Sequence, residues 1–292
     1  MEKRDLNVFG LGRITVTYTA DEHRPGDNAV TVYGDYKISI HLSNGLYGVI
    51  NDRLVGGERG DVSLYAPEEL HFGRFTVAGR FRFINILLSA DCVRSLEAEH
   101  PPLSRLFCTH GDRQNSIRAE AADKARIIES AETLALFAEH RGTCSELEAF
   151  SLILQLLLLC ATLYGQPSCL QTAPIASPFV QRTVEYIARH YADRLTLDSL
   201  ARIAGCSTVY LSMCFKQYMG STVHQYLTEY RISKAAALLR AGCSVTDVCY
   251  RVGFSDCSGF IRLFKKKRAL TPYQYKQNAT ASADTPITLR KR

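Results

Sequence analysis

The chain has 292 residues, of which 46% are hydrophobic and 22% are charged, a composition typical of globular proteins and unlike that of disordered or collagenous ones. Its length predicts two domains. The net charge of +6 is unevenly divided: residues 1–177 carry 17 Lys+Arg and 22 Asp+Glu, net −5, whereas residues 178–292 carry 18 and 7, net +11. This division favours a polyanionic partner for the second half, with a solvated basic surface as the alternative.

The ten cysteines include no CxxC pair, and several of them stand among apolar helical neighbours. Secreted disulfide frameworks are short and dense in cysteine, and zinc sites need close ligand pairs, so the pattern favours buried free thiols in a reducing cytosol. The first ten residues lack the apolar core of a signal peptide. We therefore expect a cytoplasmic protein with no metal site and no cofactor.

One segment, residues 149–165, carries no charge and raises the question of a membrane span. Polar residues interrupt it, and Gly165-Gln166-Pro167 end it short of the roughly 20 residues that a span requires. A buried or dimer-forming helix is the better prediction, so no membrane partner is expected.

The chain between Arg13 and Leu88 is expected to form short strands. Polar and apolar positions alternate, or apolar residues run in short stretches, and turn-forming residues separate the stretches. Many short strands at this spacing predict a sandwich or a barrel. The strand-like segments are residues 13–19, 29–33, 37–42, 46–50, 61–66 and 80–88.

One motif in this region is similar to the second motif of cupin-like barrels. Gly60-Asp61 opens a strand, Pro67 closes it and His71 follows, although Glu69 stands where that motif usually has Gly. Metal-binding cupins also carry an HxH pair, which the eight histidines here do not form. The resemblance therefore implies a barrel that binds a small molecule rather than a metalloenzyme.

Histidine and arginine side chains are the candidate ligand-binding residues of this barrel. A pocket on which several of them converge would distinguish such a role from that of a hydrogen-bonded structural histidine and solvated arginines. The candidates are His41, His71, Arg74 and Arg82, with Arg80 beside them.

Two helices are predicted within residues 101–165. Residues 116–140 show an apolar stripe at helical spacing, and Ser145 is positioned to cap a second helix that ends at Tyr164. The second helix is apolar nearly all round, so the barrel, the first helix or a second subunit must cover it. Residues 166–178 contain three prolines and no charge, which predicts a linker.

Residues 196–216 have the pattern of a helix-turn-helix motif. Ala201 is small where two helices must cross closely, and Gly205 supplies the left-handed turn between them. Leu211 and Phe215, four residues apart, anchor the second helix. The predicted apolar face of the first helix consists of Leu197, Leu200, Ala201 and Ala204.

A similar pattern recurs in residues 245–265, with its anchor pair 49 residues after the first pair and one more residue between the glycine and the first anchor. Cys249 takes the small position, Gly253 the turn, and Phe260 and Phe264 the anchor pair. A single long helix over residues 223–241 is predicted between the two motifs. Two helix-turn-helix motifs on a stiff connector suit two successive major-groove segments, about 34 Å apart, on one face of DNA.

This arrangement closely resembles the AraC family of bacterial transcription regulators. The resemblance covers residues 180–277 and rests on LTLDSLARIAGCS, YLTEYRISKAAALL, VTDVCYRVGFSD, GFIRLFKK and TPYQY, in the family's order and spacing. It implies an α+β protein with an all-α double helix-turn-helix domain at the C-terminal end. The predicted domains are a cupin-like β-barrel (1–100), a helical dimerisation element (101–165), the linker (166–178), the DNA-binding domain (179–278) and a polar, disordered tail (279–292).

The resemblance assigns DNA contacts to the start and one face of each recognition helix. Met213 stands where family members usually carry Arg, whereas Arg262 keeps the Arg in the second motif. Gly259 replaces a bulkier residue, and Ala269 stands where a helix-ending Gly is usual. Base readout is therefore expected to be shared unequally. The expected DNA-binding residues are Ser207, Thr208, Val209, Tyr210, Ser212, Met213, Lys216, Asp256, Cys257, Ser258, Gly259, Arg262, Lys265 and Lys266.

A basic run closes the second recognition helix, where cations favour both the helix dipole and nearby phosphates. Phosphate contact is the better prediction for this run than a merely solvated helix end, because it directly follows a helix-turn-helix. The run consists of Lys265, Lys266, Lys267 and Arg268.

The predicted function is that of a ligand-responsive, sequence-specific DNA-binding transcription regulator, with activation as the predicted mode. The expected partners are double-stranded promoter DNA, RNA polymerase, a small-molecule effector and a second copy of the chain. An enzyme built on the barrel is one alternative, but the sequence shows no HxH pair, phosphate-binding loop or nucleophile elbow. An architectural DNA-binding protein without an effector is the other.

Overall fold

The structure, a computed structural model, describes residues 1–6, 11–24, 29–31, 33–50, 53–75, 77–107, 115–141, 143–164, 166, 173–174 and 177–281. The chain divides into two compact units, a first unit (Met1–Pro174) and a second unit (Ile175–Arg292). The first unit mixes helices and sheets, and the described part of the second unit is helical. Each unit is described by itself.

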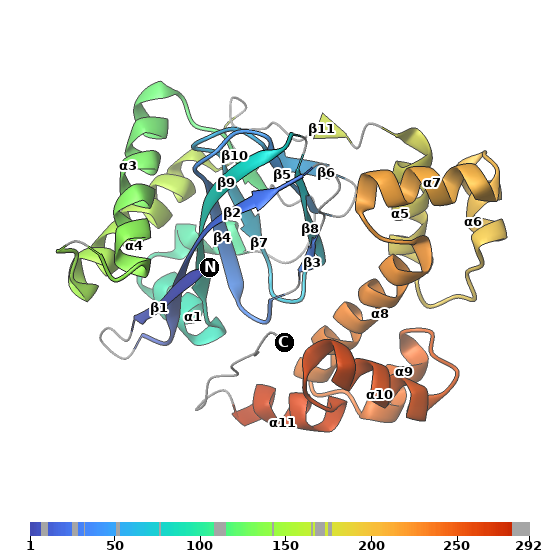
Figure 1. Cartoon of the computed structure of the whole chain (residues 1–292). Coiled ribbons are helices and arrows are strands. Elements are labelled where there is room, and N and C mark those ends of the chain that lie inside the picture. The colour runs from blue at the N-terminus through green and yellow to red at the C-terminus, as the bar shows by residue number, and fades with distance from the viewer. Residues whose placement is uncertain are drawn as a thin grey trace. The chain divides into compact units, whose positions relative to one another are not determined.

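Two sheets with antiparallel strand pairings form the centre of the first unit (Figure 1). The six predicted strand segments each overlap one of their strands, namely β2, β3, β4, β5, β7 and β9. The six-stranded sheet has the order β1 (Glu2–Leu6), β2 (Ile14–His23), β9 (Gly79–Leu88), β4 (Tyr36–His41), β7 (Val62–Tyr65) and β10 (Ser116–Ile117). The five-stranded sheet has the order β11 (Ala173–Pro174), β6 (Arg53–Gly56), β5 (Leu46–Ile50), β8 (His71–Phe75) and β3 (Ala29–Thr31).

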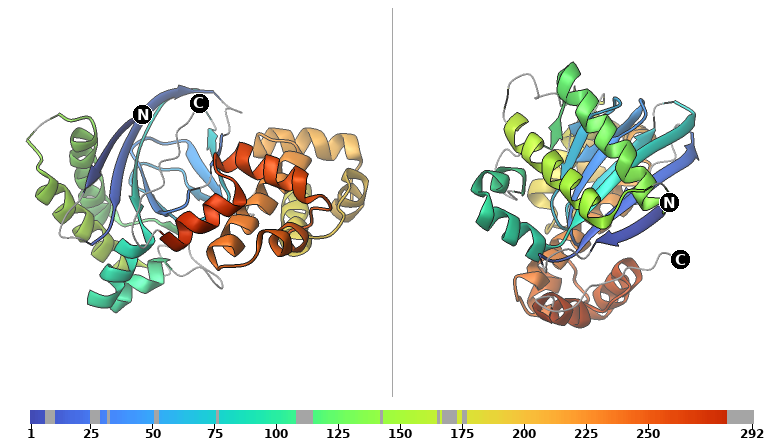
Figure 2. Two further views of the ribbon diagram at one scale, coloured as in Figure 1. Left: turned by 90° about the horizontal axis from the view of Figure 1, so that it is seen from below. Right: turned by 90° about the vertical axis from the view of Figure 1, so that its left-hand side faces the viewer.

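Helices cover one face of the six-stranded sheet. Along β4, Ile38 and Ile40 belong to the main core of the first unit, whereas Lys37 and Ser39 alternate with them and point to the other face. Figure 2 shows two long helices, α3 (Ala121–Ala138) and α4 (Glu146–Leu163), side by side against the apolar face. The helix α3 lies against β2, β4 and β9. The helices are α1 (Ala90–Glu99), the 3-10 helix η1 (Pro101–Leu103), α2 (Ser104–Phe107), α3 (Ala121–Ala138) and α4 (Glu146–Leu163).

The helix α4 begins where Ser145 predicts. The Ser145 hydroxyl accepts from the backbone N–H of Glu148, and the Glu148 carboxylate accepts from the backbone N–H of Ser145, so two otherwise unpaired donors are satisfied. One face of α4 is buried through Phe150, Ile153 and Leu157, which follow the helical period.

Three predicted boundaries are wrong. Ser116 and Ile117 are buried and pair with β7 as strand β10, because sheet pairing overrides the local helical pattern, and α3 begins only at Ala121. The predicted linker contains strand β11, which pairs with β6, and its last residue, Pro178, already begins a helix. Residues 279–281 belong to the last helix rather than to the tail, whose residues 282–292 lie outside the described residues.

Seven helices make up the described part of the second unit (Figure 1). Ser, Thr or Asp side chains cap the N-termini of the first six, which explains where these helices start. The helices are α5 (Pro178–His190), α6 (Leu197–Ala204), α7 (Thr208–Met219), α8 (Val223–Arg240), α9 (Val245–Arg251), α10 (Cys257–Arg268) and α11 (Pro272–Ala281).

Candidate nucleic-acid interface and candidate ligand site

The helices α6 and α7 form the first helix-turn-helix motif. Ala201 and Leu211 are buried between the helices, and Gly205 ends α6 in the left-handed conformation with φ +81°, donating its N–H to the carbonyl of Ala201. Phe215 is fully buried, as the anchor position predicts. Leu197, by contrast, is exposed, so the buried face of α6 consists of Leu200, Ala201 and Ala204 only.

The helices α9 and α10 repeat this arrangement. Cys249 is fully buried in the small position, and the anchor rings of Phe260 and Phe264 meet edge to face with centroids 5.8 Å apart. Gly253 has φ +88°, and a Cβ atom there would lie 2.5 Å from the carbonyl oxygen of Ala192. The repeated motif and the single connecting helix α8 are therefore confirmed.

Two of the expected DNA-binding residues cap the recognition helices α7 and α10. The Ser207 hydroxyl accepts from the N–H of Tyr210 at 3.2 Å, and the Asp256 carboxylate accepts from the N–H groups of Ser258 and Gly259 at 2.9 and 2.8 Å. A Cβ atom at Gly259 would lie 2.7 Å from Asp256 Oδ2. The unusual glycine therefore makes room for the cap, a role that only the structure reveals.

The exposed face of α7 is mostly uncharged. Val209 and Met213, four residues apart, are 78% and 58% exposed, and Ser212 and Lys216 are exposed beside them, while Thr208 is half-buried. The apolar side chains of these two residues suit contact with thymine methyl groups.

The exposed face of α10 is basic. Arg262, Lys265 and Lys266 are exposed, as is Ser258, and Cys257 is half-buried. The last two members of the basic run behave differently, because Lys267 and the buried Arg268 form ion pairs with Glu229 of α8. Arg268 thus fastens α10 to the connecting helix and is not a phosphate contact, contrary to the prediction for the whole run.

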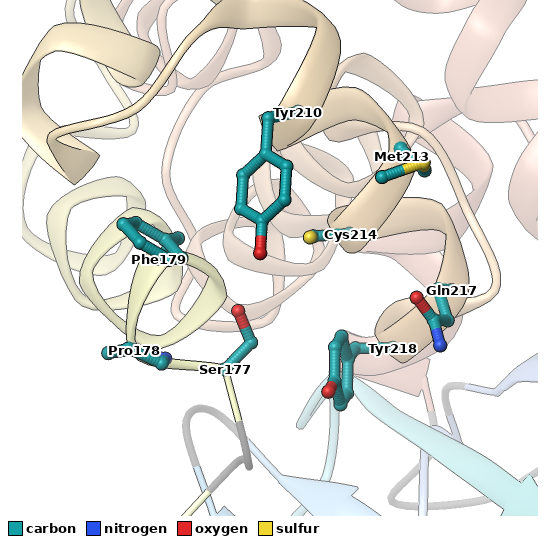
Figure 3. A pocket seen from close by; sticks show the side chains of 8 residues that line it. All are labelled: Ser177, Pro178, Phe179, Tyr210, Met213, Cys214, Gln217 and Tyr218. Carbon is teal, nitrogen blue, oxygen red and sulfur yellow. The ribbon is translucent and has the colours of Figure 1, made fainter.

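Tyr210 lies at the edge of a pocket of about 210 Å³ between α7 and the start of α5. Its ring meets that of Phe179 edge to face at 5.3 Å, and Figure 3 shows its hydroxyl near Cys214 and Ser177. The hydrogen bond with the Cys214 thiol raises the pKa of Tyr210. Met213 borders both the pocket and the exposed face of α7, whereas Tyr210 is directed into the pocket. The remaining lining residues are Pro178, Gln217 and Tyr218.

The candidate ligand residues of the first unit are divided between faces. His41 and His71 are buried on the faces through which the two sheets contact each other, where His71 Nε2 lies 2.9 Å from Lys37 Nζ. Arg74 alternates with His71 along β8 and therefore lies on the opposite face. Arg82 lies on the helical side, where its guanidinium bonds to the hydroxyl of Tyr18 and pairs with Glu132 of α3. The four residues therefore do not converge on one pocket.

Sequence reasoning missed Lys37, whose only signal is one lysine within an alternating apolar strand. Its ammonium lies over the rings of Tyr33 and Tyr65, 4.7 and 4.2 Å from their centroids. Burial lowers the pKa of Lys37 to about 7, that of His41 to about 4 and that of His71 well below its usual range. His71 Nδ1 donates to the Glu69 carbonyl, so His71 Nε2 is left to accept from Lys37.

Three further features bear on the predicted chemistry. The eight cysteines within the described ranges are free thiols. The part of the chain that the structure describes contains no group of three His, Cys, Asp or Glu side chains placed to hold a metal ion. There, α4 alone is long and apolar enough to cross a membrane, and it packs against α3.

Comparisons with known proteins give a family model and several relatives that match part of this chain. A family model described as a helix-turn-helix domain matches residues 200–278. The transcriptional activator RhaS of Escherichia coli is 37% identical over 93 residues, which is 32% of this chain and 34% of RhaS. The bifunctional transcriptional activator/DNA repair enzyme AdaA of Bacillus subtilis is 33% identical over 102 residues, 35% of this chain and 48% of AdaA.

Similar chains also occur among solved structures. The C-terminal domain of AraT, a response regulator from Geobacillus stearothermophilus, is 36% identical, with a TM-score of 0.34, over 35% of this chain and 86% of that domain. The chain thus spans between about a third and a half of the length of the curated relatives named above.

Proposed function

Because the chain belongs, by its helix-turn-helix domain, to the AraC family of transcriptional regulators, we propose that it is a ligand-responsive regulator that reads two successive major-groove segments of promoter DNA. The observation that carries this proposal is the repeated helix-turn-helix motif. The helix α8 joins its two copies, and each copy has an exposed recognition helix. The net charge of +11 over residues 178–292 supports phosphate binding by the same unit.

The two recognition helices have unequal roles in this proposal. The Arg262 guanidinium of α10 hydrogen-bonds to a guanine edge, and Lys265 and Lys266 contact phosphates. On α7, Val209 and Met213 contact thymine methyl groups. The side chains of Ser207 and Asp256 accept hydrogen bonds from the backbone of α7 and α10, which limits their contacts with DNA. In this proposal the two residues act by fixing where each recognition helix starts.

The first unit is proposed to be a cupin-like sensor rather than an enzyme, and to control DNA binding or the recruitment of RNA polymerase, with activation as the outcome. A second copy of the chain would cover exposed leucines of α3 and α4, which leave part of this helix pair apolar. These leucines are Leu136, Leu147 and Leu158, which are 43%, 60% and 44% exposed.

Selection of bound sequences from a random DNA pool, with and without small metabolites from a cell extract, tests the proposal. We expect enriched sites with two conserved segments about 10 base pairs apart, and occupancy that changes when metabolites are present. An enriched site with a single conserved segment would contradict two-segment reading. Occupancy that responds to no metabolite would favour an architectural DNA-binding protein.

A further inference from the structure

The helix α5 is attached to the first helix-turn-helix motif. It packs against both α6 and α7. Near its start, the ring of Phe179 meets that of Tyr210 on α7, and Arg182 Nη1 donates to the carbonyl of Ala204 at the end of α6, at 3.1 Å. These contacts hold α5 and the first motif together as one body. The apolar face of α5 is fully buried through Val180, Val184 and Ile187.

The loop that follows α5, residues 191–196, packs against the second motif instead. Tyr191 lies against the apolar core that contains Phe260 of α10. The carbonyl oxygen of Ala192 lies against the turn at Gly253, only 2.5 Å from where a Cβ atom would stand. Residues that continue directly from α5 therefore contact the second motif at its turn, so α8 is not the only connection between the two motifs in the described part of the chain.

Arg231 of α8 fastens this loop. Its Nε donates to the carbonyl oxygen of Tyr191 at 2.7 Å, and its Nη2 donates to that of Asp193 at 2.8 Å. The same guanidinium lies 5.7 Å from the ring centroid of Phe254, the residue after the glycine of the second turn. The planar guanidinium makes both charge-assisted bonds at once, and a cation at the C-terminal end of α5 also suits the dipole of that helix.

We propose that α5 and its loop form a second connection between the two motifs, and that Arg231 is a positioning residue that fixes the spacing of the two DNA segments. A single helix can bend, and bending of α8 would change the distance and angle between α7 and α10. A second connection, made at the turn of the second motif, opposes that movement. The inference rests on the two-segment reading proposed above and names what sets its spacing.

Two recognition helices held in this way require one spacing in the DNA. Adding or removing one base pair between the segments moves the second segment by about 3.4 Å along the duplex and turns it by about 35° around the axis. A pair of motifs that cannot adjust loses the base contacts of one recognition helix on such DNA. A pair that can adjust keeps them.

Binding of the full chain to three DNA duplexes tests the inference. One duplex carries the selected sequence, and the others have one base pair inserted or deleted between its two segments. We expect the unaltered chain to lose about 30-fold in affinity on each changed duplex, the size expected when a base contact is lost. Arg231→Met should lose less than about 5-fold on them, because its motifs can adjust to the changed spacing.

Arg240→Met is the matched control. Arg240 also lies on α8, with its guanidinium 5.8 Å from the ring centroid of Tyr275, and that ring packs against Phe264 of the second motif. The contact therefore does not join the two motifs. Arg240→Met should keep the spacing preference of the unaltered chain, even if it lowers the stability.

Arg231→Lys keeps the test decisive if circular dichroism shows that Arg231→Met is unfolded. Lysine retains the charge but lacks the planar fork that reaches two carbonyls, so this variant should lose about 10-fold on the changed duplexes. The inference would be overturned if the unaltered chain tolerated the changed spacing, if the folded Arg231 variant kept the full spacing preference, or if Arg240→Met relaxed it equally. Each of these results leaves the two-segment reading intact, whereas selection of a single conserved segment would contradict both proposals.

Discussion

Two buried charged residues of the first unit, Asp61 and Lys37, differ in whether an opposite charge balances them. The Asp61 carboxylate receives two bonds from the Arg118 guanidinium, at 3.0 and 2.7 Å, so its charge is balanced. Among the described residues, Lys37 contacts the neutral imidazole of His71 and two aromatic rings, and no carboxylate there forms an ion pair with it. A balanced buried pair contributes to a fixed structure, whereas an unbalanced buried cation costs stability and is retained where it serves a function.

Lys37→Met is expected to stabilise the chain, and more so at low pH. The pKa of Lys37 is about 7 in the folded chain and about 10.4 when unfolded, so the cost of burying its charge is full below pH 7 and disappears as the pH rises toward 10.4. The gain in unfolding free energy should therefore be about 3 kcal/mol larger at pH 6 than at pH 9. Calorimetric unfolding of both chains checks this, and a gain independent of pH would contradict the burial of an ionisable amine.

Arg262→Ala is expected to weaken specific DNA binding by about 1–3 kcal/mol and to relax the preference at one base pair, because a bidentate contact is lost. Competition binding with single-base variants of the selected site measures both effects. Equal weakening on every sequence would instead identify Arg262 as a phosphate contact.

Met213→Arg is the matched change on α7 and should strengthen binding or alter specificity. If Met213→Arg changed neither the affinity nor the specificity, α7 would lie away from the bases.

At the scale of elements, the two helix-turn-helix motifs depend on turns that share a left-handed glycine but differ in surroundings. Around Gly205, the nearest atom to an added Cβ would be the end of the Arg182 side chain at 3.5 Å. Around Gly253, it would be the Ala192 carbonyl oxygen at 2.5 Å, which belongs to the backbone and cannot move aside cheaply. The second turn is therefore held more tightly by its neighbours than the first.

Gly205→Ala and Gly253→Ala form a matched pair that tests this difference. Gly205→Ala should cost about 1 kcal/mol, because only the left-handed conformation is penalised. Gly253→Ala should cost about 3 kcal/mol or more, since the new methyl group also collides with backbone. Urea unfolding of the full chain gives both values. Equal losses would mean that the loop containing Ala192 moves freely.

At the scale of the whole molecule, charge divides the chain by function. Residues 1–177 carry −5 and residues 178–292 carry +11, so the attraction to DNA belongs to the second unit. Within the basic run, ion pairs with Glu229 distinguish two of the cations from the other two. Lys265 and Lys266 remain exposed, while Lys267 and Arg268 pair with Glu229.

The salt dependence of DNA binding should distinguish the lysines that are not paired with Glu229 from those that are. Lys266→Ala should reduce the slope of log K against log[salt] by about 1, because one phosphate contact is lost. Lys267→Ala, its neighbour on the same helix, should leave the slope nearly unchanged and lower stability instead. Equal changes in slope for the two variants would show that Lys267 leaves Glu229 to contact DNA.

The sequence by itself determined the features that depend on local pattern. Both helix-turn-helix motifs, their glycine turns, the Ser145 cap and six of the strands follow from residues close together in the chain, where period, capping and turn chemistry act directly. The tertiary structure alone decided which distant strands pair. That pairing turned residues 116–117 into a strand, separated Arg74 and Arg82 from His71, and brought Lys37 to His71 across 34 residues. A candidate ligand face depends on such long-range register, in which a shift of one residue would reverse every side chain.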